Sequence, residues 1–152
     1  MQQPRILSKR YHALNFYLYG VEIIGRSAYI YFPDFSDQGI PAKIDTGAYR
    51  SALYGEVLEE RGKQLLVRAY FLSLEHPPEI WLPGIRKKNI ISSNGQSQER
   101  WLVRIRLKLG QFEGVAECSL ANREGLTFPV LVGRRLLRNR FLVDVSKNQL
   151  QP

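Results

Sequence analysis

Apolar and polar residues alternate with a period of two along much of the chain after Val21, which is typical of strands that bury one face. The clearest example is the segment 89–110, in which two strand-like halves meet at Asn94-Gly95, a dipeptide typical of tight hairpin turns. In its second half, over residues 102–109, basic side chains alternate with Val, Ile and Leu. Similar patterns predict further strands at 27–35, 39–47, 63–74, 115–122, 126–133 and 141–145.

One segment has a helical period instead. In residues 133–141, "GRRLLRNRF", apolar side chains recur at the three-to-four spacing of a helix. The chain has no internal repeat and no alternating strand–helix units, which argues against Rossmann and P-loop folds. We therefore predict an all-β domain over residues 21–152 with one short C-terminal helix, preceded by an N-terminal extension over residues 1–20.

Turn-forming residues separate these elements. Gly110 and Gly114 are expected to bracket one turn, and residues 122–125 to form another. The proline-containing stretch 77–84 is predicted to be a loop, long enough to form a wall of a binding groove.

A chain of 152 residues, 44% hydrophobic and 24% charged, suits one globular domain with a sizeable core. The single cysteine, Cys118, cannot form a disulfide within the chain, which favours a reducing compartment and a cytoplasmic location. Because Cys118 lies in a predicted strand, we expect its side chain to be a small buried hydrophobe. No run approaches 18 uninterrupted apolar residues, and no membrane span is predicted.

The formal net charge is +8, which favours polyanionic partners. The positive residues are dispersed, however, with only modest clusters at 86–88 and 133–140. Because no long basic run or nucleic-acid-binding motif occurs, a solvated basic surface is the simplest interpretation of the charge.

The loop after the strand at 39–44 carries the candidate chemistry. Asp45-Thr46-Gly47 can be an ordinary turn or the carboxylate loop of an aspartic protease. In aspartic proteases two carboxyls share one proton, so that one activates a water while the other polarises the carbonyl. Gly47 permits a tight turn, and the Thr46 hydroxyl can hold the loop against a neighbour.

The segment "FPVLVGRRLL", residues 128–137, resembles the apolar-apolar-Gly-Arg-x-Leu-Leu segment of retroviral aspartic proteases. There the glycine lets a strand cross beneath the catalytic loop and lead into a short helix. The hairpin at 89–110 stands where those enzymes carry their flap. The chain has only one Asp-Thr-Gly and no Asp-Ser-Gly, so a catalytic pair would require a homodimer in which two Asp45 side chains meet.

Together, "KIDTGAYRSAL", "SSNGQSQER" and "SLANREGLTFPVLVGRRLLRNRFLVDV" resemble a bacterial and archaeal retropepsin-like family often labelled ATP-dependent zinc protease. Some of its relatives are associated with glutamate ligases of the ATP-grasp type. The resemblance covers roughly Val21 to Leu150. It implies a retropepsin-like closed or partly open barrel, a flap hairpin near Asn94-Gly95, and Asp45 as the catalytic carboxylate.

The resemblance also implies which residues form the site. Thr46 and Gly47 complete the catalytic loop with Asp45, while Gly133 and Arg134 serve the dimer or the packing. Substrate contacts are expected from the loop and the flap, at Ala48, Tyr49, Arg50, Ser93, Asn94, Gly95, Glu99 and Arg100. For Glu99 and Arg100 an ion pair at the base of the flap, or simple solvation, is the alternative.

The chain departs from the family pattern after the Asp-Thr-Gly. Members commonly continue with Ala-Arg-Thr-Ser-Ala-Leu-His, whereas Tyr49, Arg50 and Tyr54 stand here at the Arg, Thr and His positions. If the missing Arg and His bind substrate, specificity has changed or activity is lost.

The zinc and ATP of the family label find no support in the residues. His12 and His76 are the only histidines, they lie in unrelated contexts, and no His-Glu-x-x-His occurs. No G-x-x-x-x-G-K-[ST] is present to hold ATP phosphates. Neither a metal nor another cofactor is predicted.

Three functional hypotheses follow. The preferred one is a homodimeric aspartic peptidase that activates a water between two Asp45 carboxyls and cleaves peptides, with acidic or glutamate-rich ones favoured by the basic charge. The alternative, motivated by Tyr49 and Tyr54, is a non-catalytic peptide-binding or regulatory module. Nucleic-acid binding through charge alone is the weakest of the three.

Overall fold

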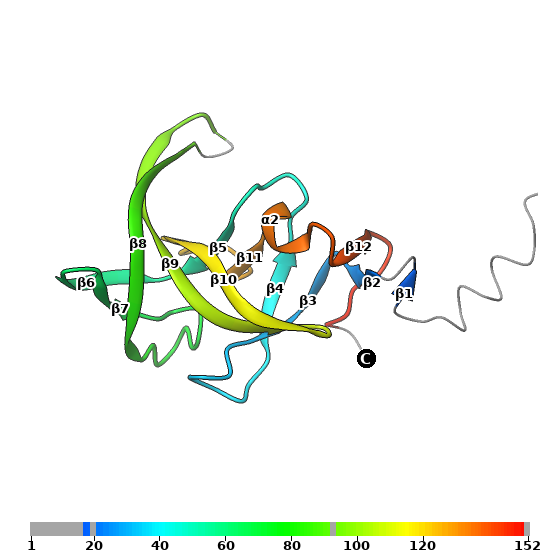
Figure 1. The fold of residues 1–152 in the computed structure, drawn as a ribbon, viewed down its shortest axis with the longest axis horizontal. Coiled ribbons are helices and arrows are strands. Elements are labelled where there is room, and N and C mark those ends of the chain that lie inside the picture. Colours follow the sequence, from blue (N-terminus) through cyan, green and yellow to red (C-terminus); the bar gives the residue numbers. More distant parts are fainter. Residues whose placement is uncertain (1–16, 19–20, 92–93, 151–152) are drawn as a thin grey trace, which may run out of the picture.

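The structure, a computed structural model, describes residues 17–18, 21–91 and 94–150. Within these ranges it consists of strands and one short helix, α2 (Arg134–Leu137) (Figure 1). The predicted all-β class is therefore confirmed. No described helix has the length and hydrophobicity that crossing a bilayer requires. The strands are β1 (Tyr17–Leu18), β2 (Val21–Gly25), β3 (Ser27–Tyr31), β4 (Ile40–Ile44), β5 (Ser51–Tyr54), β6 (Glu56–Arg61), β7 (Gln64–Arg68), β8 (Glu79–Ile91), β9 (Ser97–Leu109), β10 (Phe112–Ala121), β11 (Val130–Val132) and β12 (Phe141–Asp144).

Six strands close into a ring in the order β10-β5-β11-β4-β3-β9, because β9 pairs again with β10. Strands β8, β7 and β6 continue outward from β9, while β1, β2 and β12 form a separate small sheet (Figure 1). Strands β4 and β11 are parallel neighbours. The loops that follow them, which begin at Asp45 and Gly133, therefore leave the ring at the same end.

The core is formed by the strands of this ring together with β7, β8 and the loop between them, and β9 shows how the sequence specifies it. Its apolar residues from Val103 to Leu109 are buried, whereas the basic residues between them are exposed, as the period of two predicts. Phe32 and Phe71 meet edge to face in the core, with ring centroids 4.8 Å apart. Cys118 is fully buried, which confirms its interpretation as a small hydrophobe.

The predicted hairpin is the long arm formed by β8 and β9, which pair from Gly84 with Val103 to Ile91 with Ser97. At its turn Gly95 has φ +82°, a conformation that glycine adopts without strain. The arm rises away from the rest of the sheet and curves at its end (Figure 1).

The loop predicted over residues 77–84 is wrong from Glu79 onward, because β8 begins there and includes Pro83 and Gly84. The register between β8 and β9 shifts between Gly84 and Arg86, which marks a bulge. A proline, which lacks a backbone N–H, is tolerated in a strand at such an irregularity.

The turn predicted between Gly110 and Gly114 is shorter than expected, since Gly114 lies inside β10. The Phe112 ring would be 3.0 Å from a Cβ at position 114, so an aromatic side chain covers this glycine. The predicted strand at 63–74 ends at Arg68, and strands β5 and β6 were not predicted. The extension 1–20 lies outside the described residues except for 17–18.

Candidate active site

The Asp45 loop is tied to the strand beside it. The backbone N–H of Asp45 donates to the carbonyl of Val132 at 2.9 Å, which joins the loop to the end of β11. The N–H of Gly47 donates to Asp45 Oδ1, also at 2.9 Å, so the chain turns around its own carboxylate. A hydrogen bond from a backbone N–H fixes the orientation of a carboxyl group.

Thr46 is exposed on this loop. Its carbonyl accepts a hydrogen bond from Arg134 Nη1 at 3.1 Å, so Arg134 braces the loop from α2. Among the described residues of one protomer the Thr46 hydroxyl has no hydrogen-bond partner. The predicted contact, in which this hydroxyl holds the loop against a neighbour, is therefore not seen within one protomer.

Gly133 lets β11 pass under the loop. A Cβ at this position would lie 2.5 Å from the backbone carbonyl carbon of Arg50, a distance at which the chain would have to move. The N–H of Gly133 donates to Ser51 Oγ at 3.1 Å. The next two N–H groups, of Arg134 and Arg135, donate to the carbonyls of Ala48 and Tyr49 at 2.8 and 2.9 Å. Backbone hydrogen bonds thus join residues 48–51 to the start of α2.

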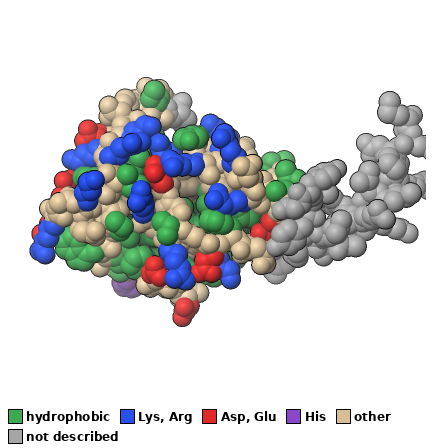
Figure 2. Space-filling model, viewed as in Figure 1, with side chains coloured by type: hydrophobic (Ala, Val, Ile, Leu, Met, Phe, Trp, Pro, Cys, Tyr) green, Lys and Arg blue, Asp and Glu red, His purple; other side chains and the backbone are tan. Residues whose placement is uncertain are grey.

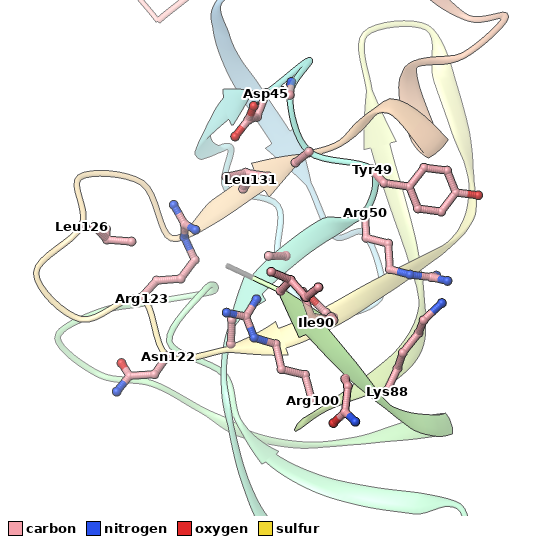
Figure 3. Close-up of a pocket in the computed structure, with 17 residues that line it drawn as sticks. Asp45, Tyr49, Arg50, Lys88, Ile90, Arg100, Asn122, Arg123, Leu126 and Leu131 are labelled. Carbon is pink, nitrogen blue, oxygen red and sulfur yellow. Dashed lines mark hydrogen bonds between the residues drawn. The ribbon is translucent and has the colours of Figure 1, made fainter. Parts of the chain in front are cut away.

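A groove of about 710 Å³ opens in front of this loop (Figure 3). One wall is the loop itself, a second is the inner face of the β8–β9 arm, and a third is the loop after β10. The arm therefore stands toward the groove as a flap would. Apolar side chains of the arm and of the third wall, Ile90, Ile91 and Leu126, also line it.

The charged residues that line the groove are four cations and one carboxylate, that of Asp45; the cations are Arg50, Lys88, Arg100 and Arg123. Figure 2 shows that Lys and Arg also predominate among the charged side chains of the outer face between the arm and α2. The groove as a whole therefore favours an anionic ligand.

The positive charge of Arg50 is neutralised by a carboxylate of the same chain. Its guanidinium forms an ion pair with Glu117 of β10, and their side chains are only 11% and 16% exposed. Arg135 Nη1 shares the same carboxylate oxygen at 3.0 Å. In Figure 3 the Arg50 side chain points away from Asp45. Arg50 is thus a structural tie between the loop and β10.

Arg100 and Arg123 approach each other across the groove from the arm and from the third wall (Figure 3). Neither forms an ion pair with a carboxylate among the described residues; Arg100 Nε donates to Gln98 Oε1 at 3.2 Å, and Arg123 Nε to the Phe128 carbonyl at 2.8 Å. Burial lowers the pKa of both guanidinium groups. The positive charge of Arg100 lowers the pKa of Arg123 further, while Asp45 raises it. The guanidinium charges of Arg100 and Arg123 are partly buried without a paired carboxylate, and an anionic ligand would supply the missing negative charge.

The structure brings together six of the predicted site residues along the groove: Asp45, Gly47, Ala48, Tyr49, Arg50 and Arg100. Asn94 and Gly95 lie at the exposed turn of the arm and do not line the groove, and Ser93 lies outside the described residues. Glu99 alternates with Arg100 along β9 and faces Lys87 instead, at 3.9 Å. Tyr54 stacks on Tyr70 at 4.5 Å and does not reach the groove.

Sequence reasoning missed Lys88 and gave Arg123 no role in the site. Lys88 pairs directly with Arg100 in the arm. Once the hairpin register is known, this pairing places both on the same face, so the register is the signal that could have found Lys88. Within the described ranges no three His, Cys, Asp or Glu side chains gather to hold a metal ion.

Comparison with known proteins identifies the family. The model of the RimB-like family, described as retropepsin-like aspartic endopeptidase RimB, matches residues 23–152. The chain belongs to this RimB-like family. The matched range contains the Asp45 loop, the β8–β9 arm and the strand β11, which together build the groove. These features therefore belong to the RimB-like domain.

Curated relatives of this RimB-like chain carry another name. A probable alpha-L-glutamate ligase of Shewanella pealeana is 28% identical over 132 residues, which are 83% of this chain and 29% of that protein. One of Desulfotalea psychrophila is 29% identical over 135 residues, 81% of this chain and 28% of that protein. The chain thus spans less than a third of the length of these relatives.

A crystal structure of a Legionella pneumophila protein of unknown function has the same fold as this RimB-like chain. The TM-score is 0.67 at 22% identity, over 84% of this chain and 95% of that one. This similarity shows that a solved structure shares the fold.

Proposed function

We propose that the protein is an aspartic peptidase that acts as a homodimer on acidic, glutamate-rich peptides. The observation that carries this proposal is the charge arrangement of the groove: beside Asp45 lie Lys88, Arg100 and Arg123, none of which forms an ion pair with a carboxylate among the described residues. One Asp-Thr-Gly per chain supplies half of a catalytic pair, and a two-fold axis beside Asp45 would supply the other half.

In this proposal the two Asp45 carboxyls share one proton. The ionised carboxylate takes a proton from a water molecule, which attacks the scissile carbonyl carbon. The protonated partner donates to the carbonyl oxygen, and the tetrahedral intermediate then collapses as the amine leaves with a proton. The N–H of Gly47 and the tie to Val132 hold each carboxylate in place for these transfers.

The substrate class follows from the cations. Arg100 and Arg123 can each bind a carboxylate with two parallel hydrogen bonds, and Lys88 adds a third positive charge on the arm. The relatives named probable alpha-L-glutamate ligase, each of which includes a segment similar to this chain, support a glutamate-containing substrate.

The alternative is a binding module without turnover. Of the residues that motivated it, Tyr54 packs on Tyr70 outside the groove, which weakens the case, but Tyr49 lines the groove where family members commonly carry Arg. Purified wild-type protein and the Asp45→Asn variant, incubated with a glutamate-rich peptide at about pH 3 to 8, separate the two functions. The peptidase requires cleavage by the wild type alone, with an unchanged melting temperature in the variant. Binding without cleavage by the wild type would establish the module.

A further inference from the structure

A second cavity, of about 300 Å³, adjoins the groove through the Arg50–Glu117 ion pair. Arg50 lines the groove, while Glu117 lines this second cavity. Its walls come from β9, β10 and the segment around α2, and they combine apolar side chains with three arginines, Arg104, Arg135 and Arg140. A polypeptide that leaves the groove past Arg50 would meet these arginines next.

The positive charge of this cavity exceeds what Glu117 can neutralise. That one carboxylate is already shared by Arg50 and Arg135. Arg104 lies opposite Glu117 in the β9–β10 register, yet it forms no ion pair among the described residues. Arg140 contacts neutral groups, since it lies 4.3 Å from the centroid of the Phe112 ring and donates to the Leu136 carbonyl at 3.1 Å. Among the described residues, the guanidinium groups of Arg104 and Arg140 thus have no carboxylate partner.

We propose that this cavity is a second binding site for carboxylate side chains of the acidic polypeptide whose cleavage site occupies the groove. The inference rests on the proposed substrate class and extends it. A guanidinium binds a carboxylate through two parallel hydrogen bonds, and Val115, which is 66% exposed, offers an apolar contact for the methylene groups of a glutamate side chain.

The same cavity is poorly suited to nucleic acid. Single strands bind by stacking bases on exposed aromatic faces, whereas the Phe112 face is already covered by Arg140. The site therefore favours carboxylates along a flexible chain over stacked bases.

A second site makes binding depend on substrate length. An extended chain spans about 3.3 Å per residue, so a tetraglutamate of about 13 Å can occupy the groove alone, whereas a dodecaglutamate of about 40 Å can reach both cavities. Contacts at the second site then become intramolecular and increase the affinity for the long peptide only.

The test measures binding of fluorescent α-linked tetraglutamate and dodecaglutamate to Asp45→Asn protein, by anisotropy at low salt. The second site is altered by Arg104→Gln with Arg140→Gln. The control removes the same charge with Lys63→Gln and Lys108→Gln, two exposed residues that line neither cavity. Thermal melting checks that both double variants fold.

We expect the second-site variant to weaken dodecaglutamate binding at least about 10-fold and tetraglutamate binding less than about 2-fold, while the control changes either by less than about 2-fold. Unchanged affinity for the long peptide would overturn the proposal. An equal loss for both lengths, or an equal loss in the control, would do the same, because general charge then accounts for binding. A single-stranded oligonucleotide that binds more tightly than dodecaglutamate and depends on the same arginines would also overturn it. Cleavage plays no part in this measurement, so failure of the peptidase proposal would appear separately, as an uncleaved peptide in wild-type protein.

Discussion

The backbone of Arg50 passes so close to Gly133 that a side-chain Cβ at position 133 would lie 2.5 Å from the Arg50 carbonyl carbon. This contact joins the strand that crosses under the site to the loop that carries Asp45. The backbone of Arg50 cannot move aside as a flexible side chain can, so the close passage of β11 beneath this loop requires glycine at position 133. The position of the Asp45 loop therefore depends on a residue that does not line the groove.

Gly133→Ala is expected to lower the free energy of unfolding by about 3 kcal/mol, because the added methyl group must displace backbone. Gly62→Ala serves as the matched control: Gly62 has φ +59° and nothing within 4 Å of its Cβ position, so only about 1 kcal/mol of backbone strain is expected. Urea unfolding measures both. An equal loss in the two variants would contradict the proposed contact.

Glu117→Gln should destabilise the protein by about 2 kcal/mol, because it leaves the largely buried Arg50 without a compensating charge. Glu113→Gln, four residues earlier on β10, breaks the exposed pair with Arg106 and should cost less than about 1 kcal/mol. Chemical denaturation compares the two. A larger loss of unfolding free energy in Glu113→Gln than in Glu117→Gln would contradict a stabilising role for the Arg50–Glu117 ion pair.

Arg100→Gln and Arg123→Gln should each lower kcat/KM on a glutamate-rich peptide about 10-fold, since a hydrogen bond to a charged group contributes about 1.5–3 kcal/mol. On the same peptide with glutamine in place of glutamate the loss should stay below about 3-fold, because the ligand charge is gone. Lys63→Gln is the control for general charge. Equal losses on both peptides would mean that these arginines do not read carboxylates.

Cys118 should resist alkylation in the folded protein. Burial, and to a smaller extent the negative charge of Glu117, raises the pKa of its thiol from 9.0 to about 12. The folded state thus holds the proton more tightly than the unfolded chain. This contribution to stability is complete below pH 9.0 and is lost as pH rises through about 12. At pH about 8, iodoacetamide should modify native protein at least about 100-fold more slowly than urea-unfolded protein. Comparable rates would place the thiol at the surface.

The sequence specified those parts of the fold in which local pattern and burial agree. The period of two in residues 102–109 and the dipeptide Asn94-Gly95 predicted the arm. Alternate side chains of this strand enter the core, and the turn requires a positive φ that glycine adopts without strain. The strand Ser51–Tyr54 escaped prediction because its first three residues are all buried, which removes the alternation. The strand Glu56–Arg61 escaped because it is a polar edge strand.

The Asp45 loop was predictable because its chemistry is local. Asp45 and Gly47 stand in one motif and contact each other directly. Arg123 comes from a loop almost eighty residues later, and its place opposite Arg100 depends on how the ring closes between β9 and β10. No local pattern encodes that closure. For the same reason Arg50, which the motif placed among the substrate contacts, is instead committed to Glu117.

The central claim is that one active site forms from two copies of Asp45, and activity of mixed dimers tests it most directly. Wild-type chains are mixed with an equal amount of Asp45→Asn chains, allowed to exchange, and assayed on a glutamate-rich peptide. If each site needs both carboxyls, only dimers of two wild-type chains work, and about a quarter of the activity of an all-wild-type sample of the same total concentration should remain. Retention of about half, in proportion to the wild-type chains present, would mean that each chain works alone and would contradict the account.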